Sequence, residues 1–74
     1  MVGRYAFANR QGEVVEFDDH AGWGTVAAAD GERWFFHCTT IADGTRTIPI
    51  GTVVTFDVVA GNGGRWEAAN LRRI

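Results

Sequence analysis

Lysine is absent from this chain, and all seven of its basic side chains are arginine. Nine aspartate and glutamate residues outweigh them, so the formal net charge at pH 7 is -2. Proteins that bind nucleic acid usually carry an excess of positive charge, because their basic groups neutralise phosphates. Charge alone therefore gives no indication of a nucleic-acid partner.

Cysteine is nearly absent as well, since Cys38 is the only one. A single cysteine cannot form an internal disulfide, which excludes a secreted disulfide scaffold and a zinc site built from paired cysteines. The remaining metal-binding candidates, Asp18, Asp19, His20 and His37, show no recurrent ligand spacing. We therefore expect no metal or other cofactor, and a reducing, cytoplasmic location.

Long apolar runs are also missing, because nowhere do about eighteen apolar residues, the length that spans a membrane, follow one another. The start of the chain, Met1 to Tyr5, has neither the apolar segment nor the cleavage site of a signal peptide. We expect a soluble, untargeted protein without a membrane partner.

A catalytic constellation is missing too. The adjacent His37 and Cys38 would point to opposite faces of a strand, so they cannot act as a base and a nucleophile together. No other nucleophile, base and orienting group can be assembled from the sequence. We therefore expect this protein not to be an enzyme.

What the chain does contain is a series of short runs typical of β-strands, within a length of 74 residues that suits one domain. Short turn-forming segments separate most of these runs, and only the stretch 39–51 is long. Such a pattern predicts a small all-β barrel, either an OB-fold or an SH3-like barrel, since periodicity does not separate the two. The predicted strands are residues 13–18, 23–28, 33–38, 52–59 and 65–73.

Four short motifs decide between these barrels. They are Gly12-Glu13-Val14-Val15-Glu16-Phe17-Asp18, Ala21-Gly22-Trp23-Gly24-Thr25-Val26, Trp34-Phe35-Phe36-His37-Cys38 and Ala68-Ala69-Asn70-Leu71. In this order and at these separations they resemble the cold-shock domain family over almost the whole chain. The resemblance implies a five-stranded antiparallel OB-fold barrel over residues 12–74, a short 3₁₀ turn near residues 39–41, and an N-terminal extension over residues 1–11.

The resemblance also implies that the domain binds single-stranded RNA or DNA, and the residues support this function independently. Strand alternation places Trp23 on one face of the second strand, and Phe35 and His37 on the same face of the third. Exposed rings of this kind form a platform on which unpaired bases stack. Gly22 and Gly24 would let a base approach closely.

Aromatic residues of the opposite phase should be core instead. Trp34 and Phe36 alternate with Phe35 and His37, so we expect them to be buried. Burial is also expected for Val14, Val26, Val54 and Phe56. The resemblance adds Phe17 to the binding surface.

The binding surface departs from the family in ways that predict weak affinity. Glu16, Thr25, Cys38 and Thr45 stand where family members usually place stacking aromatics, and Glu16 brings a carboxylate to the expected path of the phosphates. Losing several stacks of about 1–3 kcal/mol each would weaken binding substantially. Arginine can contact phosphate in a bidentate manner. The candidate phosphate partners are Arg33, Arg46, Arg65, Arg72 and Arg73.

A second interpretation stays open at this point. An acidic barrel with an exposed tryptophan also suits a protein partner or a homodimer. Oligosaccharide binding is a more distant alternative, because other barrels of this kind use it.

Overall fold

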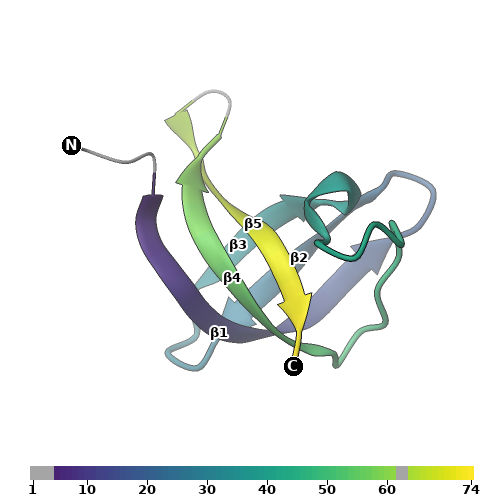
Figure 1. The fold of residues 1–74 in the computed structure, drawn as a ribbon, viewed down its shortest axis with the longest axis horizontal. Helices are drawn as coiled ribbons and strands as arrows, with labels where there is room; N and C mark the ends of the chain where they lie inside the picture. The colour runs from purple at the N-terminus through teal and green to yellow at the C-terminus, as the bar shows by residue number, and fades with distance from the viewer. Residues whose placement is uncertain (1–4, 62–63) are drawn as a thin grey trace.

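The computed structural model describes residues 5–61 and 64–74, and most of these lie in strands (Figure 1). The strands are β1 (Tyr5–Asp18), β2 (Trp23–Ala28), β3 (Arg33–His37), β4 (Val53–Ala60) and β5 (Trp66–Arg73), with a 3₁₀ helix η1 at Cys38–Thr40. They form a closed barrel in the order β1-β2-β3-β5-β4. The predicted all-β, five-stranded OB-fold barrel and the 3₁₀ turn are therefore confirmed. Within the described part of the chain, no helix is long and apolar enough to cross a membrane.

One strand pair differs from the prediction of a purely antiparallel barrel. β3 and β5 run parallel, with Phe35 opposite Glu67, while the other four pairs are antiparallel. The chain leaves β3 through η1 and the long loop and returns along β4 before β5 begins. β5 therefore runs in the same direction as β3 where the two strands close the barrel.

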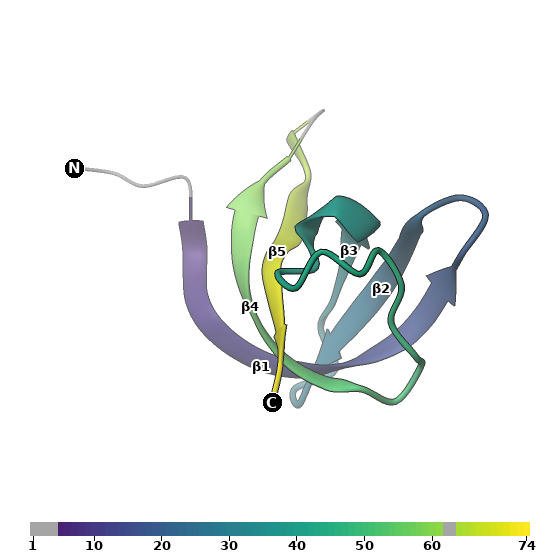
Figure 2. The same ribbon diagram turned by 45° about the vertical axis from the view of Figure 1, so that its right-hand side comes forward.

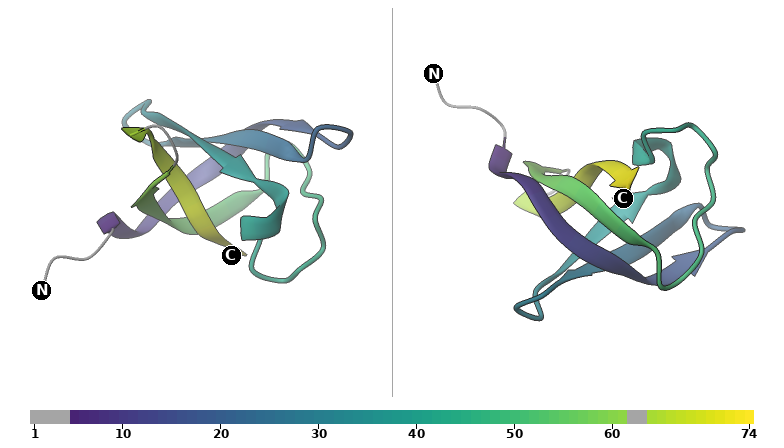
Figure 3. Two further views of the ribbon diagram at one scale, coloured as in Figure 1. Left: turned by 90° about the horizontal axis from the view of Figure 1, so that it is seen from above. Right: turned by 60° about the horizontal axis from the view of Figure 1, so that its bottom comes forward.

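β1 is longer than predicted, because it begins at Tyr5 and not at residue 13. Its second half pairs with β2, and its first half pairs with β4, where Tyr5 lies opposite Val59 and Phe7 opposite Val58. One strand thus curves along two neighbours, as Figure 2 and the right-hand view of Figure 3 show. Pairing with β4 extends the strand to Tyr5.

The carboxylate of Asp57 in β4 accepts hydrogen bonds from irregular positions in both neighbouring strands, β1 and β5. Asn9 in β1 and Asn70 in β5 adopt left-handed backbone conformations, with φ of 54° and 53°, which asparagine tolerates better than most residues. The Asn9 backbone N–H donates to Oδ1 of Asp57 at 2.9 Å, and Nδ2 of Asn70 donates to Oδ2 at 3.0 Å. Both oxygens of Asp57 are therefore used to fix the strands beside β4.

The barrel interior is filled as the alternation predicted. All six residues expected to be core are buried: Val14, Val26, Trp34, Phe36, Val54 and Phe56. Trp34 packs against Phe56 with ring centroids 5.6 Å apart. The core also contains six buried residues that were not predicted, namely Ala28, Ile41, Ile48, Val58, Ala68 and Leu71.

A side chain at Gly24 would lie inside the barrel and not on the predicted binding face. Gly24 is buried, and a Cβ there would overlap the carbonyl oxygen of Glu16 and lie 2.9 Å from the rings of both Phe17 and Phe36. The expectation that Gly24 opens space for a base is therefore wrong. Its missing side chain lets β1 and two aromatic rings approach β2 from the inside.

Arg73 anchors the long loop between η1 and β4. Its Nε donates to Oδ2 of Asp43 at 3.0 Å, and its Nη2 donates to Oγ1 of Thr45 at 3.2 Å and to the Thr47 carbonyl at 3.0 Å. The Thr47 hydroxyl in turn donates to Oδ1 of Asp19 at 2.9 Å. These bonds hold the loop against β5 and the β1–β2 turn.

Candidate nucleic-acid interface

Three aromatic side chains form a continuous row across β2 and β3. In the antiparallel register, Trp23 lies opposite His37 and Thr25 lies opposite Phe35. The ring centroids of Trp23 and Phe35 are 5.3 Å apart, and those of Phe35 and His37 are 4.8 Å apart with an edge-to-face geometry. We call these three residues the ring platform. The sequence predicted this grouping from alternation alone.

The exposure of the ring platform is uneven. Trp23 is 38% exposed and His37 is exposed, whereas Phe35 is half-buried. Phe35 is therefore less exposed than predicted. Its neighbours cover it, because Trp23 and His37 flank it on β2 and β3 and Glu67 of β5 lies opposite it on the other side.

Phe17 does not lie in this row. The pairing of β1 with β2 shifts between Val14 and Glu16, so that Phe17 comes opposite the buried Gly24. Its ring stacks on the core ring of Phe36, with centroids 5.9 Å apart and planes 10° apart. A bulge of this kind reverses the faces that simple alternation predicts, and no local signal marks it. Phe17 is packed partly into the core.

Glu16 borders the ring platform because of the same bulge. It is exposed and lies opposite Thr25, whose hydroxyl donates to Oε1 of Glu16 at 3.2 Å. A surface hollow of about 260 Å³ lies beside Trp23. Its lining residues are Glu16, Phe17, Asp18, Trp23 and Ile50. The sequence did not predict Ile50 here, because its position depends on the path of the long loop.

The candidate phosphate partners are distributed unevenly. Arg33 begins β3 in the same alternation as Phe35 and His37, and Arg65 directly precedes β5. Because β3 and β5 are parallel, both arginines lie at the same end of this strand pair.

The other three candidates lie elsewhere. Arg46 lies exposed in the long loop, with φ of 60°. Arg73 forms the ion pair with Asp43. Arg72 lies near Asp57, whose pKa is lowered mainly by hydrogen bonds from Asn70 and Asn9 and to a smaller extent by the Arg72 charge. Of the five candidates, Arg33 thus shares strand β3 with two rings of the platform, and Arg65 lies at the start of the neighbouring strand β5.

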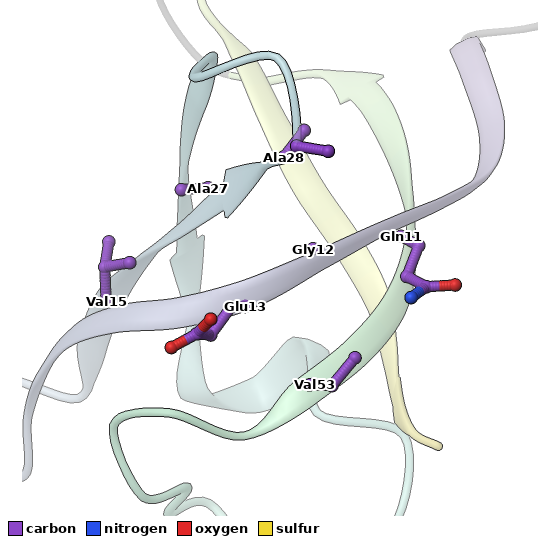
Figure 4. A pocket seen from close by; sticks show the side chains of 8 residues that line it. Gln11, Gly12, Glu13, Val15, Ala27, Ala28 and Val53 are labelled. Carbon is purple, nitrogen blue, oxygen red and sulfur yellow. The ribbon is translucent and has the colours of Figure 1, made fainter.

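A second hollow of about 380 Å³ lies on another part of the surface, over β1, β2 and β4 (Figure 4). None of its lining residues is aromatic, and its one ionisable side chain is Glu13. It offers neither a stacking surface nor a cation for phosphate. Figure 4 shows the small side chains of Val15, Ala27 and Val53 around it.

Within residues 5–61 and 64–74, no three His, Cys, Asp or Glu side chains are grouped so that they could hold a metal ion. Cys38 is half-buried and packs against the core.

The chain is similar to known cold-shock proteins over most of its length. Residues 10–74 match the model of the 'Cold-shock' DNA-binding domain. The chain is 33% identical to the cold shock protein CspB of Bacillus caldolyticus over 66 residues, which are 88% of this chain and 98% of that protein. It is 36% identical to the cold shock-like protein CspD of Bacillus cereus over 63 residues, covering 84% and 94% of the two chains. The cold shock protein CspD of Bacillus subtilis is 32% identical over 66 residues, covering 88% and 98%.

Proposed function

The chain belongs to the cold-shock domain family, and from this premise we propose that it binds single-stranded RNA or DNA by stacking bases on the ring platform. Family membership supports nucleic-acid binding in general. The preference for single strands, the stacking mode and the weak affinity are our proposals. The role is binding and not catalysis, and the single half-buried cysteine suits a cytoplasmic location.

The observation that carries this function is the contiguous row of Trp23, Phe35 and His37. Successive centroid distances of 5.3 Å and 4.8 Å leave no gap between the rings, so neighbouring bases can stack along one surface. Every base has a π-face, and stacking therefore tolerates many sequences. The hollow shown in Figure 4, although larger, has no ring.

Arg33 and Arg65 supply the phosphate contacts in this arrangement. They lie at the end of the β3–β5 pair where both strands begin, whereas Trp23 and His37 lie at the opposite end of β3. A strand of nucleic acid that stacks on the rings and runs along β3 would bring its phosphates to these guanidinium groups. Arg46 contributes from the long loop, and Phe17 contributes through the hollow beside Trp23.

The affinity is weak because the ring platform is short and its borders are acidic. Glu16 lies next to Thr25 on one side, and Glu67 lies opposite Phe35 on the other. Each carboxylate opposes nearby phosphates at low salt. Stacking worth about 1–3 kcal/mol per base then acts against this repulsion with few cations to help.

A second candidate function is association with a protein or with a second copy of the chain. Exposed apolar side chains favour it, since Ile50 is 64% exposed and Trp66 is 51% exposed. These two residues come from different parts of the fold, the long loop and the start of β5, and neither belongs to the ring platform. We therefore rank this function second.

The test is a fluorescence titration of the Trp66→Phe protein with a short oligothymidine at low salt. This substitution removes the exposed tryptophan outside the ring platform, and Trp34 is buried. A change in emission then reports on Trp23. Saturable quenching supports single-strand binding, whereas unchanged emission together with a dimer in sedimentation analysis supports the second function.

A further inference from the structure

The border of the ring platform carries a hydrogen-bond acceptor that is held in place. Glu16 lies opposite Thr25 on the neighbouring strand, and Trp23 is two residues from Thr25 on the same face of β2. Glu16 and Trp23 are therefore diagonal neighbours, and both line the hollow of about 260 Å³. A base stacked on Trp23 would have one edge directed toward this carboxylate.

The hydrogen bond from Thr25 uses only part of the capacity of Glu16. The hydroxyl donates to Oε1 at 3.2 Å, and within the described residues Oε2 has no hydrogen-bond partner. An ionised carboxylate accepts hydrogen bonds and cannot donate them. Asp18, at the same hollow, also has one oxygen without a partner in the described residues, but its Oδ1 accepts from two backbone N–H groups, those of His20 and Ala21. Glu16 accepts a single hydrogen bond, so it is the less committed of the two acceptors.

The edges of the bases differ in what they offer to such an acceptor. The Watson–Crick edge of guanine presents two adjacent donors, the N1–H and the 2-amino group, which match the two oxygens of a carboxylate. Adenine and cytosine present one amino group next to a ring nitrogen that accepts. Thymine and uracil present one N–H between two carbonyl oxygens, which face a carboxylate unfavourably.

We propose that Glu16 makes this domain select guanine, by accepting hydrogen bonds from the Watson–Crick edge of a guanine that stacks on Trp23. This inference rests on the proposed function, since it assigns a base preference to the same site. Selectivity is a difference between affinities, so it is compatible with weak overall binding. The carboxylate that opposes phosphates and thymine stabilises guanine.

The experiment compares single strands that differ at one position. A heptathymidylate is prepared with its central thymine unchanged or replaced by guanine, hypoxanthine or 7-deazaguanine. Hypoxanthine lacks only the 2-amino group, and 7-deazaguanine keeps the whole Watson–Crick edge. Because all three substitutes have a bicyclic ring of purine size, their comparison separates edge recognition from the stronger stacking of a larger ring. A single guanine also avoids the self-association of guanine-rich strands.

The unmodified protein should bind the guanine and 7-deazaguanine strands about fivefold to tenfold more tightly than the hypoxanthine strand, the range expected for loss of one good base-edge contact. Glu16→Gln should lower this ratio toward one, because the amide keeps only one acceptor oxygen and places its NH₂ donor against one of the two guanine donors. Glu13→Gln is the matched control. It removes the same charge from the same strand at the other hollow, and it should leave the ratio unchanged.

Two different failures can be told apart. Equal binding of the guanine and hypoxanthine strands, or a ratio that survives Glu16→Gln, overturns the guanine preference alone, provided that Trp23→Ala still weakens binding of every strand. If no strand binds, or if Trp23→Ala has no effect, the proposed function fails and the inference fails with it.

Discussion

The ring platform and the region around β4 use their polar groups in opposite ways. Around β4, both oxygens of Asp57 accept hydrogen bonds from Asn9 and Asn70. At the ring platform, three rings lie at the surface and Glu16 keeps one carboxylate oxygen without a partner in the described residues. We call the region of Asp57, Asn9 and Asn70 the brace. At the brace the carboxylate is fully used within the fold, whereas at the ring platform one oxygen of Glu16 stays available.

The largest expected effect is a loss of binding affinity when a ring of the ring platform is removed. Trp23→Ala should lower the affinity for a short oligothymidine by about 1–3 kcal/mol, roughly fivefold to 150-fold, because it removes one stacking surface. The free energy of unfolding should change little, since Trp23 lies outside the core. Binding is measured by fluorescence anisotropy of a labelled strand, and stability by urea unfolding.

Trp66→Ala is the control for this variant. It removes an equally large and even more exposed ring, 51% against 38%, from outside the ring platform. It should not alter affinity. Similar losses of affinity in both variants would mean that any exposed tryptophan contributes to binding, so that the ring platform would not be a distinct binding surface.

The second effect concerns stability and the brace. Asp57→Ala should lower the free energy of unfolding by about 1–2 kcal/mol, because it removes two hydrogen bonds to a partly exposed carboxylate and leaves two left-handed asparagines without their acceptor. Affinity for the oligothymidine should stay within about twofold of the unmodified value. A variant that loses binding at full stability would show that the brace takes part in recognition.

Acid should weaken the brace in a defined direction. Hydrogen bonds from Asn70 and then from Asn9 hold the pKa of Asp57 below its ordinary value of 3.8. Hydrogen bonds from Thr45 and the Arg73 guanidinium lower the pKa of Asp43 in the same way. A carboxyl group whose pKa is lower in the folded than in the unfolded state stabilises the fold fully above its unfolded pKa, and this contribution is lost as the pH falls through the folded pKa.

Urea unfolding across a pH series tests this effect. Stability should therefore fall as the pH drops below about 4. The fall should be shallower in Asp57→Asn, which cannot lose a charge at that position. An equally steep fall in that variant would show that ionisation of Asp57 does not contribute to the loss of stability in acid.

The smallest expected effect is the salt dependence of binding. With Arg33 and Arg65 as the main phosphate contacts, the slope of log affinity against log salt should be about -1 to -2, since each phosphate contact on a single strand contributes about -0.7. Arg33→Gln should make the slope smaller in magnitude. Arg73→Gln should leave it unchanged, because the guanidinium that it removes is paired with Asp43. A much steeper slope would mean that more cations contact the phosphates than Arg33 and Arg65.

Much of this fold could be predicted from the sequence, because alternation is a local property. The core set including Trp34, Phe36 and Phe56, and the grouping of Trp23 with Phe35 and His37, follow from which face of a strand each residue occupies. The resemblance to the cold-shock domain family then selected the OB-fold barrel over an SH3-like one.

The features that sequence reasoning missed depend on contacts between distant segments. The bulge that turns Phe17 toward Phe36 comes from the register between β1 and β2. The parallel β3–β5 pair that brings Glu67 next to Phe35 comes from barrel closure, and the place of Ile50 comes from the path of the long loop. None of these leaves a periodic signal in its own segment.

The most direct test of the central claim is a two-dimensional ¹H–¹⁵N NMR titration of the protein with heptathymidylate. Stacking on the ring platform should shift signals of β2 and β3, including the indole N–H of Trp23 and the amides of Thr25, Phe35 and His37. Signals of the brace, namely the Asn9 and Asp57 amides and the Asn70 side-chain amide, should keep their positions. Shifts concentrated at the brace, with the Trp23 indole signal unmoved, would show that the ring platform is not the binding surface.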